Sequence, residues 1–218
     1  MTKKAAKYKA PQWRAKICVL TVIAVLALAV SSCDSGSSDR ADAGKPASST
    51  AKTQVNRVLS LDGEPIDPFA NVQDRPVVLL FVRTDCPISN RYAPEMRRLM
   101  REFGQFKFWL VYPDADSKAE TIRQHLKEFA LDCEVLRDPD HVLVRLANAR
   151  VIPEAAVFGA QRRLVYHGRI DDRFVSFGEA RPAATTHELQ EVLSAMAVGK
   201  NPSVESVPAV GCTIGPNS

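Results

Sequence analysis

The sequence of 218 residues predicts a three-layer α/β domain with helices on both faces of a central mixed sheet. Two observations carry this prediction. A continuous apolar run over residues 76–82 stops just before Cys86 and gives way to helical periodicity, which is the pattern of a buried strand running into a helix. Further on, predicted strands and helices alternate until a hairpin and a closing helix complete the pattern.

The first half of the domain begins with a short hairpin over residues 57–66, turning at Asp62-Gly63. After the strand at 76–82, apolar residues at helical spacing predict a helix over 90–106, and residues 106–112 form the next buried strand. A helix over 117–129 follows. Its start has the capping-box pattern, with Ser117 three residues before Glu120.

The second half is predicted from shorter signals. Residues 133–136 form a short strand and residues 142–147 a helix, and Pro153 breaks the chain just before a strand over 154–158. A turn at 159–163 and a strand at 164–167 complete a hairpin, Asp171-Asp172 is read as a turn, and residues 187–197 form the closing helix. The predicted domain therefore extends from residue 55 to residue 199, the length of one ordinary domain.

The N-terminus has the pattern of an export signal. Residues 1–16 hold six basic side chains and no acidic one, and the apolar run over 17–30 is too short to span a bilayer. Residues 30–33, Val-Ser-Ser-Cys, resemble a bacterial lipobox, in which the cysteine becomes the acylated first residue. This resemblance implies a signal peptide over 1–32, lipid attachment at Cys33 and a membrane-anchored lipoprotein on the periplasmic side of the cell envelope. An uncleaved membrane anchor is the alternative.

Residues 33–54 are predicted to be a flexible tether, because they are rich in serine and contain no aromatic side chain. The charge balance also depends on the leader. Six of the 29 basic residues lie in it, and the remaining 23 stand against 25 acidic residues. The formal charge of +4 therefore belongs to the leader, and we expect no nucleic-acid partner.

Five cysteines are present, and three of them, Cys86, Cys133 and Cys212, fall outside the leader and the lipid site. Three cysteines are too few for a disulfide scaffold, and no pair has zinc-ligand spacing. The four histidines form no ligand cluster either, so neither a metal nor another cofactor is expected. An odd number of cysteines in an exported protein leaves at least one thiol free or transiently paired, which favours a redox function.

Cys86 is the candidate nucleophile, because it stands where the buried strand ends and a helix begins. The unpaired amides and the dipole of a helix N-terminus favour a thiolate there. Pro87 suits the first helical turn, where the missing N–H costs nothing. The alternative is a buried core thiol. We expect a reactive sulfur to be open to solvent and close to the bend at Pro153.

Residues 81–99, FVRTDCPISNRYAPEMRRL, resemble the active-site segment of bacterial redoxins in the thioredoxin and peroxiredoxin superfamily. The spacing of Cys86 and Pro94 matches, and Ile152-Pro153 occupies the place of that family's cis-proline, which faces the sulfur. The resemblance extends over about residues 57–197. It implies a thioredoxin-like three-layer sandwich and a thiol-based oxidoreductase, with Cys86, Thr84, Ser89 and Pro153 as catalytic residues.

Two departures from the family pattern leave the reaction open. Ser89 replaces the second cysteine of the thioredoxin motif and cannot resolve a mixed disulfide. Thr84 precedes Cys86 by two residues where peroxiredoxins have three, and Leu79 replaces their proline. Both a protein disulfide and a peroxide therefore remain as substrates, with an external thiol as reductant.

Any resolving thiol must come from elsewhere in the chain or from outside it. Cys212 is the preferred candidate, because it lies in a Pro/Gly-rich tail over 200–218 that has no helix or strand pattern and is free to swing over the site. Cys133 opens a short strand and is expected to be a buried structural thiol. A bridge between Cys133 and Cys212 stays open as a further alternative.

Two other functions are kept beside the oxidoreductase. The first is copper handling of the Sco type, which requires a second cysteine four residues after Cys86, where this chain has Asn90. The second is a binding module without catalysis, which docks partners on the face around Pro153.

Overall fold

The structure is a computed structural model that describes residues 57–72 and 75–215. Its central sheet has five strands in the order β3-β2-β1-β5-β6. Strands β1 (Val77–Phe81), β2 (Lys107–Tyr112) and β3 (Val135–Arg137) run parallel to one another. Strands β5 (Glu154–Phe158) and β6 (Leu164–Gly168) join as an antiparallel hairpin beside β1. The predicted mixed sheet is therefore confirmed.

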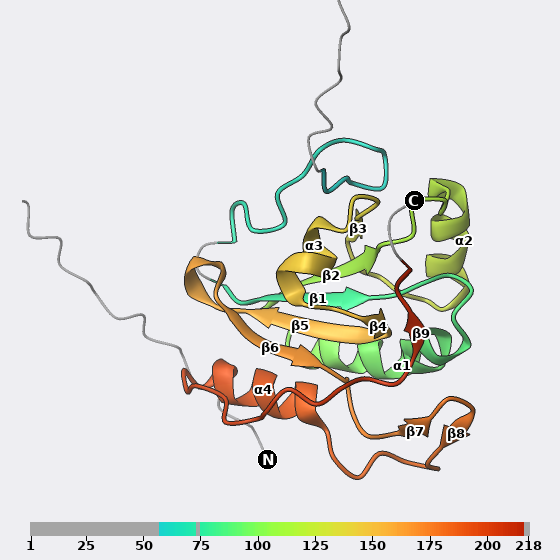
Figure 1. The fold of residues 1–218 in the computed structure, drawn as a ribbon. Coiled ribbons are helices and arrows are strands. Elements are labelled where there is room, and N and C mark those ends of the chain that lie inside the picture. Colours follow the sequence, from blue (N-terminus) through green and yellow to red (C-terminus); the bar gives the residue numbers. More distant parts are fainter. Residues whose placement is uncertain (1–56, 73–74, 216–218) are drawn as a thin grey trace, which may run out of the picture. The chain divides into compact units, whose positions relative to one another are not determined.

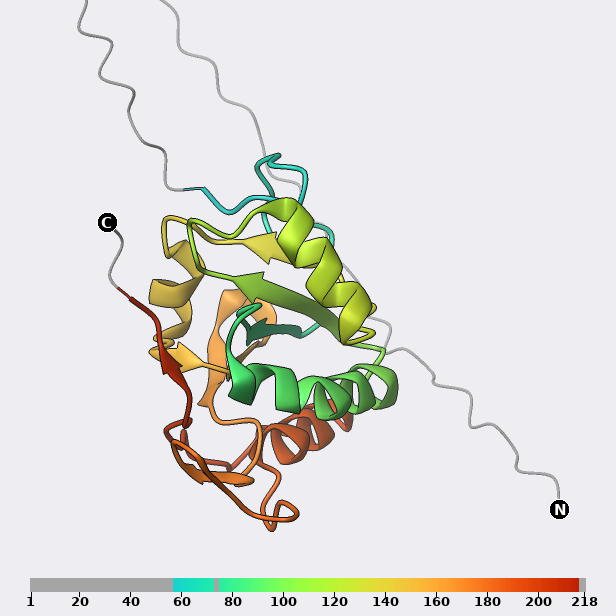
Figure 2. The same cartoon turned by 90° about the vertical axis from the view of Figure 1, so that its right-hand side faces the viewer.

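Helices cover both faces of the sheet. Helices α1 (Pro87–Glu102), α2 (Ala119–Glu128) and α4 (Glu188–Ala197) lie on one face, and α3 (Val142–Ala147) lies on the other (Figures 1 and 2). A hydrogen bond from Arg98 to Gln190 joins α1 to α4. The three layers are those of a thioredoxin-like fold, as predicted.

The sheet is held by apolar burial at its centre. Every side chain of β1 and β5 is buried, and so is all of β2 after Lys107. Because β1 has neighbours on both sides and helices on both faces, its sequence is apolar throughout rather than alternating. Its C-terminal end is fixed in place by this packing, and Cys86 follows five residues after Phe81.

Of two local predictions, the cap of α2 is wrong and the hairpin at the start of the domain is confirmed. Ser117 does not cap α2: the helix begins after Lys118, and the Ser117 hydroxyl donates to the Asp114 carboxylate at 2.9 Å instead. The short hairpin predicted over 57–66 does form: a bridge joins Leu59 to Pro65, the Ser60 N–H donates to the Glu64 carbonyl at 2.8 Å, and the Ile66 N–H donates to the Val58 carbonyl at 2.9 Å. Leu59 also exchanges hydrogen bonds with Arg137 at the end of β3, which attaches the hairpin to the sheet.

Four short strands were not predicted. Strand β4 (Val151–Ile152) pairs with β9 (Cys212–Thr213), and β7 (Phe174–Ser176) pairs with β8 (Glu179–Ala180). The turn expected after β5 is present as a 3₁₀ turn, η1 (Ala160–Arg162). The tail was expected to have no regular structure. It contains β9 because its backbone finds hydrogen-bonding partners on β4.

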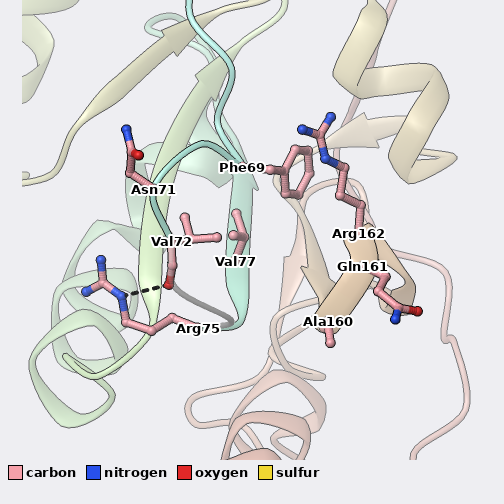
Figure 3. A pocket seen from close by; sticks show the side chains of 9 residues that line it. Phe69, Asn71, Val72, Arg75, Val77, Ala160, Gln161 and Arg162 are labelled. Atoms are coloured by element: carbon pink, nitrogen blue, oxygen red, sulfur yellow. Dashed lines mark hydrogen bonds between the residues drawn. The ribbon is translucent and has the colours of Figure 1, made fainter. Parts of the chain in front are cut away.

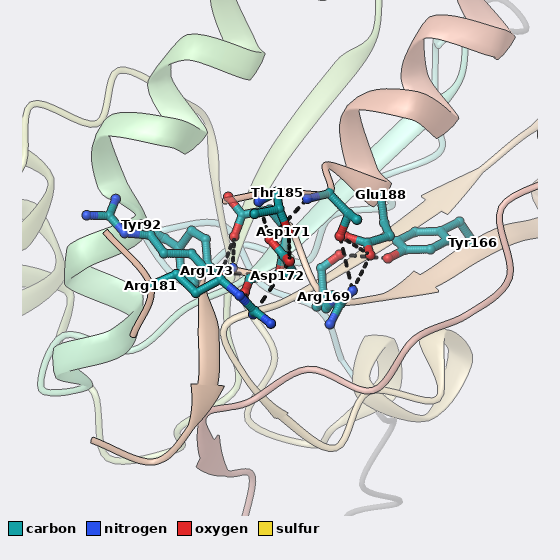
Figure 4. A network of polar contacts seen from close by, with 10 residues as sticks. Tyr92, Tyr166, Arg169, Asp171, Asp172, Arg173, Arg181, Thr185 and Glu188 are labelled. Atoms are coloured by element: carbon teal, nitrogen blue, oxygen red, sulfur yellow. Dashed lines mark hydrogen bonds and ion pairs between the residues drawn. The ribbon is translucent and has the colours of Figure 1, made fainter. Parts of the chain in front are cut away.

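Asp171 and Asp172 do more than form a turn. Both side chains are buried, and each accepts hydrogen bonds from distant segments, in the network that Figure 4 shows. The Tyr92 hydroxyl on α1 donates to Asp171 at 2.6 Å. Asp172 accepts from the backbone N–H groups of Thr185 and Thr186 and from the Thr185 hydroxyl. These two carboxylates therefore tie α1 and the segment before α4 to the end of the sheet.

Replacing Asp172 with asparagine is expected to lower the free energy of unfolding by about 1–2 kcal/mol, because an amide presents fewer acceptors to the Thr185 and Thr186 donors. The hydrogen bond from Thr185 holds the pKa of Asp172 well below its usual range. The stabilisation is therefore fully present above the pKa of an unfolded aspartate, near 4, and is lost progressively as the pH falls from there through the much lower pKa of the folded state. Urea titrations at pH 7 and pH 3 check this: the difference in stability between the two proteins should be largest at pH 7 and smaller at pH 3.

The predicted signal peptide (1–32), the lipid site at Cys33 and the whole tether (33–54) lie outside the described residues and stay predictions. Within residues 57–72 and 75–215, no helix combines the length and the apolar character needed to cross a membrane.

Candidate functional site

Cys86 occupies the junction that the sequence predicts. It is the N-cap residue of α1, with extended backbone, and Pro87 opens the helix. The helix starts earlier than its periodicity indicated, at residue 87 rather than 90, and Pro94 lies inside it. The end of β1 and the start of α1 therefore fix the position of the Cys86 sulfur.

The Cys86 sulfur contacts two groups from distant parts of the chain. Its thiol donates to the backbone carbonyl oxygen of Ile152 at 3.3 Å, and its Sγ atom lies 2.7 Å from Sγ of Cys212. The Ile152-Pro153 peptide bond is cis. The expected proximity of the sulfur to the bend at Pro153 is confirmed.

The expected exposure of this sulfur is wrong for the conformation described. Cys86 is only 1 % exposed, and its sulfur lies against the Cys212 sulfur and the Ile152 carbonyl. No first-turn amide of α1 donates to its side chain, and the Cys86 thiol instead donates a hydrogen bond to the Ile152 carbonyl. The structure therefore holds Cys86 as a covered thiol, which must lose its proton before it can act as a nucleophile.

The tail reaches Cys86 by adding a strand to β4. Residues Ile152 and Cys212 stand opposite each other in the antiparallel pair, and the Ile214 N–H donates to the Arg150 carbonyl at 3.0 Å. Farther back, the Val207 carbonyl accepts from the Arg169 N–H at 3.0 Å. The tail is thus fixed on both sides of Cys212.

The tail lies so close to the domain that one position requires glycine. A Cβ atom built on Gly211 would overlap the carbonyl oxygen of Ile152. Gly211 directly precedes Cys212, so the absence of its side chain lets the second sulfur approach the first. A glycine next to a cysteine in an otherwise irregular tail was the only sequence signal of this close approach.

Cys212 is protonated at neutral pH in this conformation. Burial, followed by the contact with Cys86, raises the pKa of Cys212 to about 11. Its S–H group can donate to the Cys86 sulfur while the Cys86 thiol donates to Ile152. The described state is therefore a pair of thiols in direct contact.

Cys133 lies away from this pair. It precedes β3, whereas Cys86 follows β1, and because these strands run in the same direction the two cysteines belong to opposite ends of the sheet. Burial raises the pKa of Cys133 to about 12. These observations agree with the predicted structural thiol, and the alternative bridge between Cys133 and Cys212 is not formed here.

The other two candidates contact the site through the backbone or not at all. Thr84 offers its carbonyl oxygen, which accepts from the side-chain amide of Asn90 at 3.1 Å. Ser89 is buried, and its hydroxyl has no hydrogen-bond partner among the described residues. Ser89 therefore makes no hydrogen bond to Cys86 in this conformation.

Asn90 stands at the position where the copper hypothesis requires a second cysteine. Its amide is held by His125 and by the Thr84 carbonyl, so it supplies no soft ligand beside Cys86. Elsewhere, single atoms of Glu95, Asp171 and His187 come within 4.8 Å of one another. Both carboxylate oxygens of Glu95 already accept hydrogen bonds from Arg98. The guanidinium group therefore neutralises the negative charge that would attract a cation to this cluster.

A separate pocket lies at the other end of the sheet. Its volume is about 290 Å³, and it opens between the start of β1 and the end of β5, next to Phe69 and Arg162 (Figure 3). Cys86 follows the opposite end of β1, and no cysteine lines the pocket. It is therefore not part of the cysteine site.

A comparison with protein-family models matches residues 47–167 to the AhpC/TSA family. This range is more than half of the chain and includes β1, Cys86, the cis bond at Pro153 and most of β6. The chain belongs to the AhpC/TSA family. It is thus a redoxin with a thioredoxin-like fold. The AhpC/TSA match ends before the tail, so it does not include Cys212.

Solved structures agree with the AhpC/TSA assignment at the level of the fold. An uncharacterized conserved protein of Geobacillus kaustophilus is 19 % identical, with a TM-score of 0.60 over 72 % of this chain and 86 % of its own. A hypothetical protein of Sinorhizobium meliloti 1021 is also 19 % identical, with a TM-score of 0.56 over 72 % and 88 %. A search of curated proteins found no match.

Proposed function

We propose that this AhpC/TSA-family protein is a two-cysteine thiol oxidoreductase, in which Cys86 attacks the substrate and Cys212 resolves the product. The observation that carries the proposal is the distance of 2.7 Å between the two sulfur atoms, which come from residues 126 positions apart. A disulfide between them requires only a short further approach and the loss of two protons and two electrons.

With a peroxide, the Cys86 thiolate attacks one peroxide oxygen, the O–O bond breaks, and the second oxygen leaves as an alcohol or as water. Cys86 becomes a sulfenic acid. The Cys212 sulfur then attacks the Cys86 sulfur, and the Cys212 proton leaves with the hydroxyl group as water. The contact between the two sulfur atoms in the described state supports this second step.

With a disulfide, the Cys86 thiolate attacks one of its sulfur atoms and forms a mixed disulfide, and the other half leaves as a thiol. Cys212 then displaces the first half and closes the same internal disulfide. In both cases an external thiol reductant restores the pair. Because Cys86 is covered and Cys212 is partly exposed, the reductant meets the Cys212 sulfur first.

The proposed place of action is the periplasmic side of the cell envelope, where a lipid on Cys33 anchors the protein to a membrane. The basic and apolar segments of residues 1–30 and the lipobox-like Val-Ser-Ser-Cys support it. The predicted tether over residues 33–54, which begins with Cys33, would give the site room to reach partners in solution.

The experiment is a single turnover of the Cys212→Ser variant with hydrogen peroxide and, separately, with a small aromatic disulfide. Wild-type protein should end with Cys86 and Cys212 joined. The variant should stop one step earlier, as a Cys86 sulfenic acid that dimedone traps or as a stable mixed disulfide, because a serine hydroxyl cannot resolve either product. The electrophile that reacts faster with Cys86 identifies the substrate class.

The matched control is Cys133→Ser, which removes a thiol from the other end of the sheet and should behave as wild type. Continued turnover of Cys212→Ser at the wild-type rate, in the presence of a dithiol reductant and with no trapped intermediate, would show that Cys212 is not the resolving residue.

A further inference from the structure

A chain of hydrogen bonds connects the core of the domain to the loop that carries Cys86. The Tyr112 hydroxyl lies 2.8 Å from Nδ1 of His125, and Nε2 of His125 lies 2.8 Å from Oδ1 of Asn90. The Asn90 amide nitrogen then donates to the Thr84 carbonyl at 3.1 Å. We call these four residues the His125 chain; they belong to β2, α2, α1 and the loop after β1.

The protons of the His125 chain run in one direction. Burial raises the pKa of Tyr112, which therefore stays a neutral donor, and burial lowers the pKa of His125, which therefore stays a neutral imidazole. Because Tyr112 donates to Nδ1, the histidine proton is on Nε2 and points to the Asn90 oxygen. The Asn90 oxygen thus faces His125, and its NH₂ group faces Thr84. Each donor in the chain meets an acceptor.

His125 acts on Cys86 only through Asn90. The Asn90 side chain holds the Thr84 carbonyl, two residues before Cys86, and the Asn90 backbone N–H donates to the Cys86 carbonyl at 3.0 Å. Asn90 therefore fixes the turn over residues 84–86 from both ends. His125 is 4 % exposed and makes no contact with either sulfur, so it takes no part in the reaction itself.

We propose that His125 is a positioning residue: by fixing the orientation of the Asn90 amide, it holds the turn before Cys86 so that the Cys86 sulfur meets Cys212. This proposal rests on the proposed function, because it assigns a role in closing the Cys86–Cys212 pair. The sequence did not indicate this role of His125, since the four histidines form no cluster and Asn90 was identified only as the residue in place of a second copper-ligating cysteine.

The test is the rate at which diamide, a small reagent that oxidises pairs of thiols to disulfides, closes the Cys86–Cys212 disulfide in the full chain. His125→Phe keeps the ring and removes both nitrogen atoms, and Asn90→Ala removes the amide. Each should slow closure about tenfold, because a small displacement of a reacting group is costly. His125→Gln, which can donate to Asn90, should recover most of the rate. The double variant should close no more slowly than the slower single one.

Asp172→Asn is the control for loss of stability, since it weakens the fold without touching the His125 chain. The proposal is overturned if the disulfide of His125→Phe closes at the wild-type rate. It is also overturned if His125→Phe and Asp172→Asn lower the Tm equally and slow disulfide closure equally. Additive effects in the double variant would also overturn it. Diamide closure requires no natural substrate, so absent turnover with peroxide and disulfide would refute the proposed function alone.

Discussion

Replacing Cys86 with serine is expected to reduce the rate of reaction with both hydrogen peroxide and a model disulfide to that of buffer. Sulfur chemistry at the site begins with this thiol, and an alcohol at the same position is neither ionised at neutral pH nor nucleophilic toward sulfur. The Cys212 thiol should also stay free after the oxidant is added, because the variant has no oxidised Cys86 sulfur at 2.7 Å with which Cys212 could form a disulfide. Stopped-flow kinetics and thiol titration measure the two effects.

Serine is the closest replacement in size, and the burial of Cys86 makes a stability control necessary. The Tm of Cys86→Ser should remain within a few degrees of wild type, and Cys133→Ser should keep the wild-type rates with both reagents. A Cys86→Ser protein that consumes peroxide or disulfide as fast as wild type would place the chemistry at another residue.

Replacing Gly211 with valine is expected to separate the two cysteines without removing either. The new side chain would overlap the Ile152 carbonyl oxygen, so β9 cannot pair with β4 in its present register. Closure of the disulfide by diamide should then slow by about 100-fold, since Cys212 loses its fixed approach. Alkylation of Cys86 by iodoacetamide should become faster, because the group that covers it has left.

Gly215→Ala is the matched control, because it changes a glycine of the same tail where an added Cβ meets open space. It should close and alkylate as wild type. Equal closure rates for Gly211→Val and wild type would mean that the docking of the tail on β4 does not bring the cysteines together.

Long apolar or periodic segments made most of the fold predictable. Strand β1 is buried on both faces, so each of its residues is apolar and the strand is recognisable from sequence. Helix α3 and strand β5 were predicted at their observed bounds. The start of α1 was placed three residues late, because Pro87 and Ser89 mask the helical pattern in its first turn. Strands β4 and β7, of two and three residues, are too short to show a periodic pattern and were not predicted.

The site was predictable as chemistry but not as geometry. The position of Cys86 after a buried strand, and that of Pro153 before another, pointed to the two segments that meet. The cover over Cys86 was not predictable, because it depends on main-chain pairing between Ile152 and Cys212, which leaves no pattern in side chains. The buried role of His125 was hidden for a similar reason, since its partners lie 13 and 35 residues away.

Asp171 and Asp172 show a further limit of prediction from sequence. Adjacent acidic residues usually mark an exposed turn, yet here both are buried, because tyrosine, threonine and backbone donors from three segments converge on them. These donors are brought together only by the tertiary structure, so a local sequence pattern does not predict them.

The most direct measurement is peptide mapping of wild-type protein after one equivalent of oxidant, with free thiols alkylated and no reductant added. The peptide that contains Cys86 should appear linked to the peptide that contains Cys212, and Cys133 should appear alkylated. Recovery of Cys86 in alkylated form, or linked to Cys133 or to a second copy of the chain, would contradict the account.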